Sequence, residues 1–175
     1  KGIFIEGTSI ISRERESKLK EKGLNSTFIE KCKKYLYEPG ISVFKEALLA
    51  NKSFNIKAFH DPTEGGLATG LAEMAIASNT GILIEREKVT ILPEPSILSK
   101  IFDLEPMGTI SSGSLLIAID DDLSQDLIDL LRNNQINAEK IGNFINKEKG
   151  LMIKENDGKL NPLFYSETDE ITKIF

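Results

Sequence analysis

The chain has 175 residues, of which 40% are hydrophobic and 28% charged, with a net charge of −5 and a pI of about 5.1. This composition is typical of a globular domain, the acidic balance argues against a nucleic-acid surface, and no apolar run approaches the length of a membrane span. The single cysteine, Cys32, allows no internal disulfide and fits a reducing compartment. We therefore expect a cytoplasmic protein without nucleic-acid or membrane partners, in which Cys32 is a buried helix residue.

The first residues predict a strand that leads into a charged helix. Residues 1–6 are expected to be extended, and Gly7 and Thr8 to form a turn that caps a helix from about Ser9. The later part of this helix, residues 13–22, is a run of charges. Such a run is typical of a solvated face.

Two further helices are predicted before residue 51. Gly23 closes the charged helix, and residues 25–27 offer caps for the next one, in which apolar residues recur at helical spacing over 28–36. The Pro39-Gly40 pair ends that helix. A third helix is expected over residues 43–50.

An extended run meets a helix near the centre of the chain. Residues 54–59 alternate between apolar and polar with period two, which predicts a strand with one buried face. Pro62 ends this strand, and Thr63 is a natural N-cap for the following helix. Gly65 and Gly66 in the first turn leave backbone amides open, and the helix dipole adds roughly half a positive charge there. The pattern predicts an anion cradle, with a glycine-rich turn that binds nothing as the alternative.

Two side chains next to this turn are candidates for chemistry. His60, the only histidine, precedes the turn and is a candidate general acid or base, with a purely structural role as the alternative. Glu64 in the first turn would stabilise the helix by about 0.3 to 1 kcal/mol but would repel a phosphate. Three roles are open for Glu64: stabilising the helix alone, binding Mg²⁺ that binds phosphate, or facing a neutral or cationic ligand.

The central helix and the elements after it are well marked. Apolar and small residues predict a helix from residue 67 that ends at 79–81, followed by a short apolar strand at 81–85. Residues 89–91 are expected to be extended. Pro93 and Pro95 then begin a helix that runs through Phe102.

A second loop of small residues follows over residues 107–113. Ser111, Ser112 and Gly113 are small and permissive, and are expected to form a second wall of a site, with an ordinary turn as the alternative. Residues 114–119 are continuously apolar, which predicts a buried central strand. The three aspartates at 120–122 are interpreted as the favoured acids of a helix start, in preference to a metal site.

The last part of the chain predicts strands and a short helix. Residues 138–145 are expected to be a strand, and 151–155 with 159–163 a hairpin. A terminal helix is expected from Glu167 or Thr168. Residues 1–175 are therefore interpreted as one compact α/β domain.

Three stretches together resemble a known family. The motif HDPTEGGL at 60–67 is similar to the one that opens the carboxy-terminal domain of proteins related to aminoimidazole ribonucleotide (AIR) synthetase, most closely its hydrogenase-maturation, HypE-like branch. Residues 1–8 and 110–117 resemble the first strand and the second glycine-serine loop of that domain. The resemblance implies a mixed sheet with helices on its faces, PurM-like and partly ferredoxin-like in topology.

The same resemblance implies an activity. The full-length protein is expected to be an ATP-dependent ligase or dehydratase that activates an amide or carbamoyl-type oxygen by phosphorylation, with ATP and Mg²⁺ as cofactors. His60 would be catalytic, Thr63, Gly65 and Gly66 would contact phosphate, Glu64 would bind the metal, and the 111–113 loop would contact a small-molecule substrate.

The chain departs from the branch that matures hydrogenases at two points. Glu64 stands where arginine is usual, and the chain ends without the terminal cysteine tail. The amino-terminal ATP-binding domain is expected to precede Lys1 in a homodimeric full-length protein, so the fragment alone is expected to be inactive. A non-catalytic nucleotide-binding or assembly module of a metallo-enzyme maturation complex is the alternative.

Overall fold

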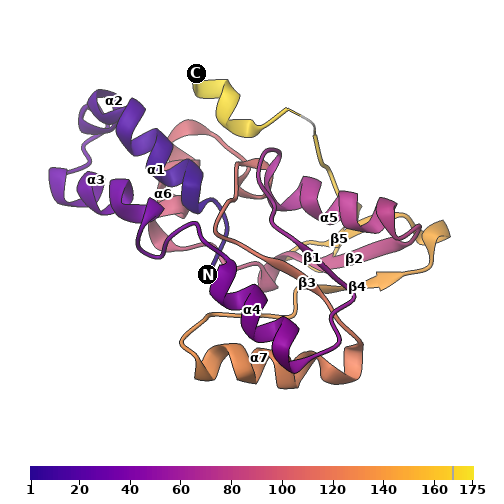
Figure 1. Ribbon diagram of the computed structural model, residues 1–175. Helices are drawn as coiled ribbons and strands as arrows, with labels where there is room; N and C mark the ends of the chain where they lie inside the picture. The colour runs from indigo at the N-terminus through magenta and orange to yellow at the C-terminus, as the bar shows by residue number, and fades with distance from the viewer. Residues whose placement is uncertain (167) are drawn as a thin grey trace.

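The chain forms two β-sheets surrounded by helices (Figure 1). The computed structural model describes residues 1–166 and 168–175, and the features reported below refer to these residues. Three helices near the amino terminus gather at one end of the molecule with α6, and α5 lies along the larger sheet (Figure 1). This arrangement confirms the predicted α/β class with a mixed sheet.

The amino-terminal helices are α1 (Ile5–Glu14), α2 (Glu16–Glu21), α3 (Ser26–Lys33) and α4 (Phe44–Ser53). The predicted cap before α3 is confirmed, because the Asn25 side chain accepts a hydrogen bond from the Phe28 amide at 2.9 Å. Cys32 is fully buried in α3, as expected, and burial raises the pKa of its thiol to about 11.

The predicted strand over residues 1–6 is wrong. Only Ile3 makes a β-bridge, with Ile91, and α1 begins at Ile5, so Gly7 and Thr8 lie inside the helix instead of capping it. Phe4 takes a left-handed conformation with φ of 63°, and its fully buried ring packs against Gly7. Burial of this apolar stretch among other elements decides its conformation, and the local pattern carried no sign of that.

The larger sheet has the strand order β4-β2-β5-β6. The central strand β2 (Gly81–Glu85) pairs antiparallel with β4 (Gly142–Ile145) and parallel with β5 (Leu151–Lys154). The predicted hairpin is confirmed, since β6 (Leu160–Pro162) pairs antiparallel with β5.

The smaller sheet contains β1 (Ala58–His60) and β3 (Leu116–Ala118), which pair antiparallel with His60 opposite Leu116. The predicted strand over 54–59 therefore starts late, because Phe54 caps the end of α4. The prediction of a central strand over 114–119 is also wrong. Within the described residues β3 pairs with β1 alone. Its apolar side chains are buried by packing against helices.

Three helices complete the fold. Helix α5 (Gly66–Ala77) contacts β2, α6 (Pro93–Phe102) contacts α1, and α7 (Ser124–Asn133) contacts α4. The aspartates at 120–122 lead through a 3-10 turn into α7, at the predicted helix start, but none of their side chains forms a capping hydrogen bond. No helix in the described ranges has both the length and the apolar character that crossing a membrane requires.

The carboxy-terminal segment ends in a 3-10 helix, η6 (Glu170–Ile174). This helix starts later than the predicted terminal helix, of which Glu167 lies outside the described residues. The segment crosses the start of α5 and returns to α1, where Arg15 donates two hydrogen bonds to the Ile174 carbonyl.

Candidate functional site

The candidate site is the glycine turn, residues 60–66, which joins β1 to α5. Gly65 has φ of 73° and Gly66 has φ of 65°, a region that favours glycine. A Cβ on Gly65 would lie 2.7 Å from the Ser166 carbonyl oxygen, and one on Gly66 would lie 2.5 Å from the Met107 carbonyl oxygen. Both glycines are therefore required by backbone conformation and by the close approach of other segments.

Thr63 does not cap the helix. Gly65 occupies the N-cap position, no side chain bonds there, and Thr63 is exposed. The Thr63 carbonyl instead accepts hydrogen bonds from the amides of Gly66 at 3.1 Å and Ser111 at 3.2 Å. The two loops singled out from the sequence are thus adjacent, joined through the backbone of Thr63.

A carboxylate of this chain, that of Asp169, binds at the start of α5. The Gly65 amide donates a hydrogen bond to Asp169 Oδ2 at 2.7 Å, and Asp169 is only 7% exposed. The other carboxylate oxygen accepts from the Ile171 amide at 2.9 Å. A negative group at a helix start is favoured by the dipole and by the amides there. Sequence reasoning missed Asp169, because only the fold brings it to a turn 104 residues away.

The glycine turn as it stands does not fit a phosphate group. The Gly65 amide is bonded to Asp169 and the Gly66 amide to Thr63, so neither is free for a phosphate oxygen. Glu64 is exposed beside them. Across residues 1–166 and 168–175, no three His, Cys, Asp or Glu side chains come together as a metal site. The described residues therefore include no group of three such ligands in which Glu64 could take part.

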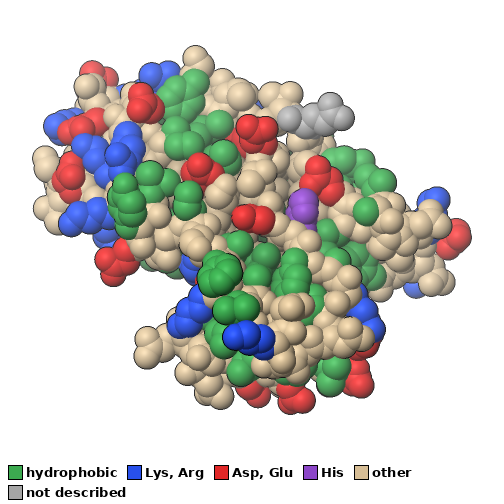
Figure 2. Space-filling model, viewed as in Figure 1, with side chains coloured by type: hydrophobic (Ala, Val, Ile, Leu, Met, Phe, Trp, Pro, Cys, Tyr) green, Lys and Arg blue, Asp and Glu red, His purple; other side chains and the backbone are tan. Residues whose placement is uncertain are grey.

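His60 pairs with a carboxylate of α5. Its Nε2 lies 2.9 Å from Glu73 Oε2, and the imidazole side chain is 33% exposed. The ring packs over Gly70, where a Cβ would lie 2.9 Å from Cδ2. His60 is therefore reachable from solvent and held in orientation by Glu73, instead of being enclosed by apolar side chains. Figure 2 shows the imidazole at the surface, near several acidic side chains.

Asp61 contributes a second carboxyl group next to His60. Burial raises the pKa of this carboxyl above its usual value, the charge of His60 opposes that shift, and the charge of Glu6 adds to it. The end of β1 thus places one imidazole among acidic groups. The arrangement is suited to moving a proton at a partly exposed position.

The 111–113 loop is built into the fold. Ser111 is fully buried, and its Oγ accepts a hydrogen bond from the Phe4 amide at 3.1 Å. Gly113 has φ of 104°, and a Cβ there would lie 2.9 Å from the Gly40 carbonyl oxygen. Ser112 is partly exposed. Ser111 therefore positions the start of α1, and contact of this loop with a substrate stays a prediction.

The glycine turn lines neither of two cavities in the described part of the chain. The larger, of about 440 Å³, takes only Gly113 from the predicted site residues. The smaller, of about 320 Å³, lies between the end of α6 and the carboxy-terminal segment. His60 lies on a surface between β1 and α5 and lines neither of these cavities.

The chain is thus an α/β domain with a mixed sheet, in which a glycine turn begins the helix that covers the sheet and a histidine precedes that turn. A family model described as "AIR synthase related protein, C-terminal domain" matches residues 3–154. The chain belongs to this family, as the sequence resemblance predicted.

Curated relatives come from the hydrogenase-maturation branch. A protein of Methanocaldococcus jannaschii, whose name proposes a role in hydrogenase expression and formation, is 34% identical over 110 residues, which are 62% of this chain and 33% of that protein. Carbamoyl dehydratase HypE of Rhizobium leguminosarum bv. viciae is 25% identical over 92 residues, 53% of this chain and 26% of that protein. The matches thus span about a third or less of these relatives.

Solved structures show the same fold. HypE of E. coli superposes with a TM-score of 0.67 at 20% identity, covering 76% of this chain and 42% of that chain. A HypE structure described as a complex with ATP gives a TM-score of 0.67 at 20% identity, covering 98% of this chain and 50% of that one. At this identity the likeness establishes the fold alone.

Proposed function

We propose that this chain is the carboxy-terminal domain of a HypE-like protein that uses ATP to activate an amide or carbamoyl-type oxygen. The family match and the names of the relatives, carbamoyl dehydratase among them, support this reaction class. The single observation that carries a catalytic role for this domain is the partly exposed His60, held by Glu73 beside the glycine turn.

His60 would move a proton in this reaction. When Nε2 donates its hydrogen to Glu73, the neutral ring has Nδ1 as its free acceptor. Glu73 would be a positioning residue, because it fixes the ring without touching the substrate. ATP would supply a phosphoryl group that makes an amide oxygen a better leaving group. An imidazole that takes up or returns the proton of such an amide contributes typically 10²- to 10⁴-fold to a rate.

The nucleotide contacts are proposed to lie mainly outside this chain. The Gly65 and Gly66 amides are bonded internally, so a phosphate could reach them only after Asp169 moved away. An amino-terminal domain of the same protein would provide the ATP and Mg²⁺ contacts, in a homodimer. A cytoplasmic location is part of this proposal, and the single cysteine is its only support.

One observation favours the alternative of a non-catalytic binding or assembly module. The turn that was expected to receive phosphate is closed by Asp169, a group of the domain itself. If this contact persists in the complete protein, the domain would contribute shape and partner contacts to a maturation complex without touching the nucleotide.

The test uses the complete gene product, with ATP turnover measured against carbamoyl and amide acceptors and ATP affinity measured separately. His60→Asn is expected to lower turnover at least a hundredfold with ATP affinity unchanged. Glu73→Gln should lower it about tenfold, while Glu14→Gln, on the exposed side of α1, should leave it unchanged. Full turnover in His60→Asn would support the assembly module instead. Absence of turnover with every acceptor in the unaltered protein would remove the enzymatic proposal.

A further inference from the structure

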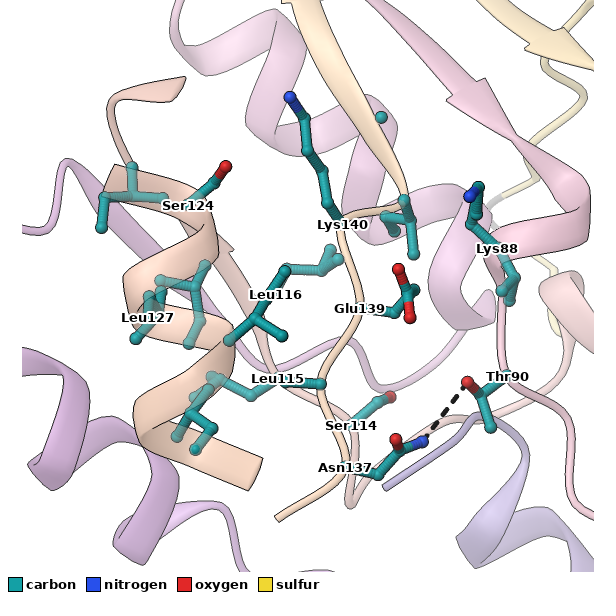
Figure 3. A pocket seen from close by; sticks show the side chains of 18 of the residues that line it. Lys88, Thr90, Ser114, Leu115, Leu116, Ser124, Leu127, Asn137, Glu139 and Lys140 are labelled. Atoms are coloured by element: carbon teal, nitrogen blue, oxygen red, sulfur yellow. Dashed lines mark hydrogen bonds between the residues drawn. The ribbon is translucent and has the colours of Figure 1, made fainter. Parts of the chain in front are cut away.

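The larger cavity lies away from the glycine turn. Its volume of about 440 Å³ falls within the range of small-molecule sites. Figure 3 shows Leu127 of α7, Leu116 of β3 and the preceding Leu115 on one side, and Lys88 and Thr90 on the other. The segment leading to β4 passes between these sides. Residues of both β3, in the smaller sheet, and β4, in the larger sheet, line the cavity.

Most polar groups on the cavity wall are bonded to the protein. Asn137 donates to Thr90 Oγ1, and the Ser114 hydroxyl donates to the Ser111 carbonyl at 2.6 Å. Further along the wall, Glu139 accepts a hydrogen bond from Arg132. These groups give the cavity a polar rim around an apolar interior, which suits an amphipathic molecule.

Glu46 is the exception on this wall. The residue comes from α4, is 6% exposed, and its Oε1 lies 3.1 Å from Lys1 Nζ. Oε2 is the one buried side-chain nitrogen or oxygen, among those of the described residues, without a hydrogen-bond partner. A buried carboxylate oxygen is a strong acceptor, and leaving it unpaired is unfavourable.

The hydrogen-bond partner that Glu46 Oε2 lacks should be a neutral donor. The ammonium of Lys1 already faces Glu46 and donates to the carbonyls of Gly40 and Ser42, so its three hydrogens are in use. A second cation would be repelled by Lys1, and an anion by the carboxylate itself. A neutral N–H or O–H group meets neither penalty.

We propose that this cavity binds a small molecule with an apolar body and a neutral amide or hydroxyl donor, which pairs with Glu46 Oε2. The apolar body lies against the leucines of β3 and α7. Glu46 lines the cavity, but its Oε2 atom is buried in this structure, so the donor reaches this atom after a rotation of the carboxylate. This site is separate from His60 and the glycine turn, so it does not depend on the function proposed above.

The experiment titrates the 175-residue chain with hexanamide, hexanoate and hexylamine, and follows backbone amide resonances by NMR. Hexanamide is expected to shift the resonances of Leu116, Leu127 and Asn137 and to bind at least tenfold more tightly than the other two probes. Glu46→Met, of similar length but without an acceptor, should weaken hexanamide about tenfold. Ala118→Leu, which adds volume on the cavity wall, should weaken all binding, and Glu14→Gln should change nothing.

Three results would overturn the proposal. Hexanoate binding as tightly as hexanamide would mean that the ligand's polar end meets Lys88, which has no ion-pair partner in the described residues. Hexanamide affinity unchanged in Glu46→Met would exclude Glu46 as the acceptor. Absence of shifts at these positions would mean that the cavity does not bind such molecules. Should Glu46→Met fail to fold, two measurements still test the proposal: the order of affinities of the three probes for the unaltered chain, and the affinity of hexanamide for the Ala118→Leu variant.

Discussion

The glycine turn and the larger cavity differ in how their polar groups are satisfied. At the turn, the Gly65 and Gly66 amides have partners within the chain, and Asp169 supplies the negative charge that a helix start favours. In the cavity, apolar side chains leave open space, and the Glu46 Oε2 atom lacks a partner. The amides of a conspicuous motif can therefore have all their partners within the folded chain. A ligand can instead bind where the fold leaves a polar group unpaired.

The largest expected effect tests how tightly the turn is closed. Gly66→Ala should lower the free energy of unfolding by about 4 kcal/mol, since its Cβ would lie 2.5 Å from the Met107 carbonyl oxygen at a positive φ. Urea unfolding measures this. Gly158→Ala is the matched control, because it shares a positive φ of 83° but has no atom within 4 Å. The control should lose only about 1 to 2 kcal/mol. Equal losses would mean that close approach at the turn is unimportant.

The second prediction removes the internal anion. Asp169→Ala leaves the buried amide of Gly65 and the Ile171 amide without acceptors, and should lower the free energy of unfolding by about 2.5 kcal/mol. Asp122→Ala, at an exposed position before α7, should change it by less than about 0.5 kcal/mol. Hydrogen exchange of the Gly65 amide, faster in Asp169→Ala alone, locates the change. Unchanged protection would show that the carboxylate does not close the turn in solution.

The third prediction compares packing beside the cavity with packing in the main core. Leu127→Ala should cost about 2 kcal/mol and Leu19→Ala about 3 to 4 kcal/mol, because Leu127 already faces open space whereas Leu19 is fully buried. Thermal and urea unfolding of both variants measure the two losses in free energy of unfolding. A cost for Leu127→Ala equal to that for Leu19→Ala would indicate that the cavity is closed in solution.

The smallest expected effect is a pH dependence of the segment that closes the turn. Burial would raise the pKa of Glu170, but hydrogen bonds from Lys173 and the Glu105 amide outweigh it and lower the pKa below its usual 4.5. Because the folded pKa is depressed, this carboxylate stabilises the fold above pH 4.5, and the contribution is lost as the pH falls through the folded pKa.

Glu170→Gln should therefore cost about 1 kcal/mol at pH 7, and the difference from the unaltered chain should shrink towards pH 3. Urea unfolding at the two pH values measures it. Glu148→Gln, at an exposed position, serves as the control. A difference that stayed constant with pH would mean that packing, and not charge, explains the loss.

Sequence patterns located the elements whose signals are local. The start of α6 at Pro93, the cap at Asn25 and the β5–β6 hairpin all appear where predicted. A proline at the first helical position, a side-chain cap and a tight turn act within a few residues, so the chain carries their signals without reference to the fold. The three stretches of motif resemblance likewise led to the family that the match over residues 3–154 establishes.

Sequence patterns were less informative about the site. They singled out His60 and the glycines but not Glu73 as the partner of the imidazole, nor Asp169 as the anion at Gly65. Ser111 was expected to face a substrate, and its buried hydroxyl instead accepts from the Phe4 amide, 107 residues earlier. Each of these partners is set by packing between elements.

The sequence by itself indicated the family through its three motif stretches, and the mixed sheet through that resemblance. It also indicated the α/β class and the position of the glycine turn, because turn chemistry and hydrophobic period are local properties. Only the tertiary structure decided that the first helix begins at Ile5, that β3 pairs with β1 alone among the described strands, and that Asp169 closes the start of α5. The physical reason is the same in each case. Burial leads most apolar faces and polar groups to find a partner, and many of those partners lie far away in the chain.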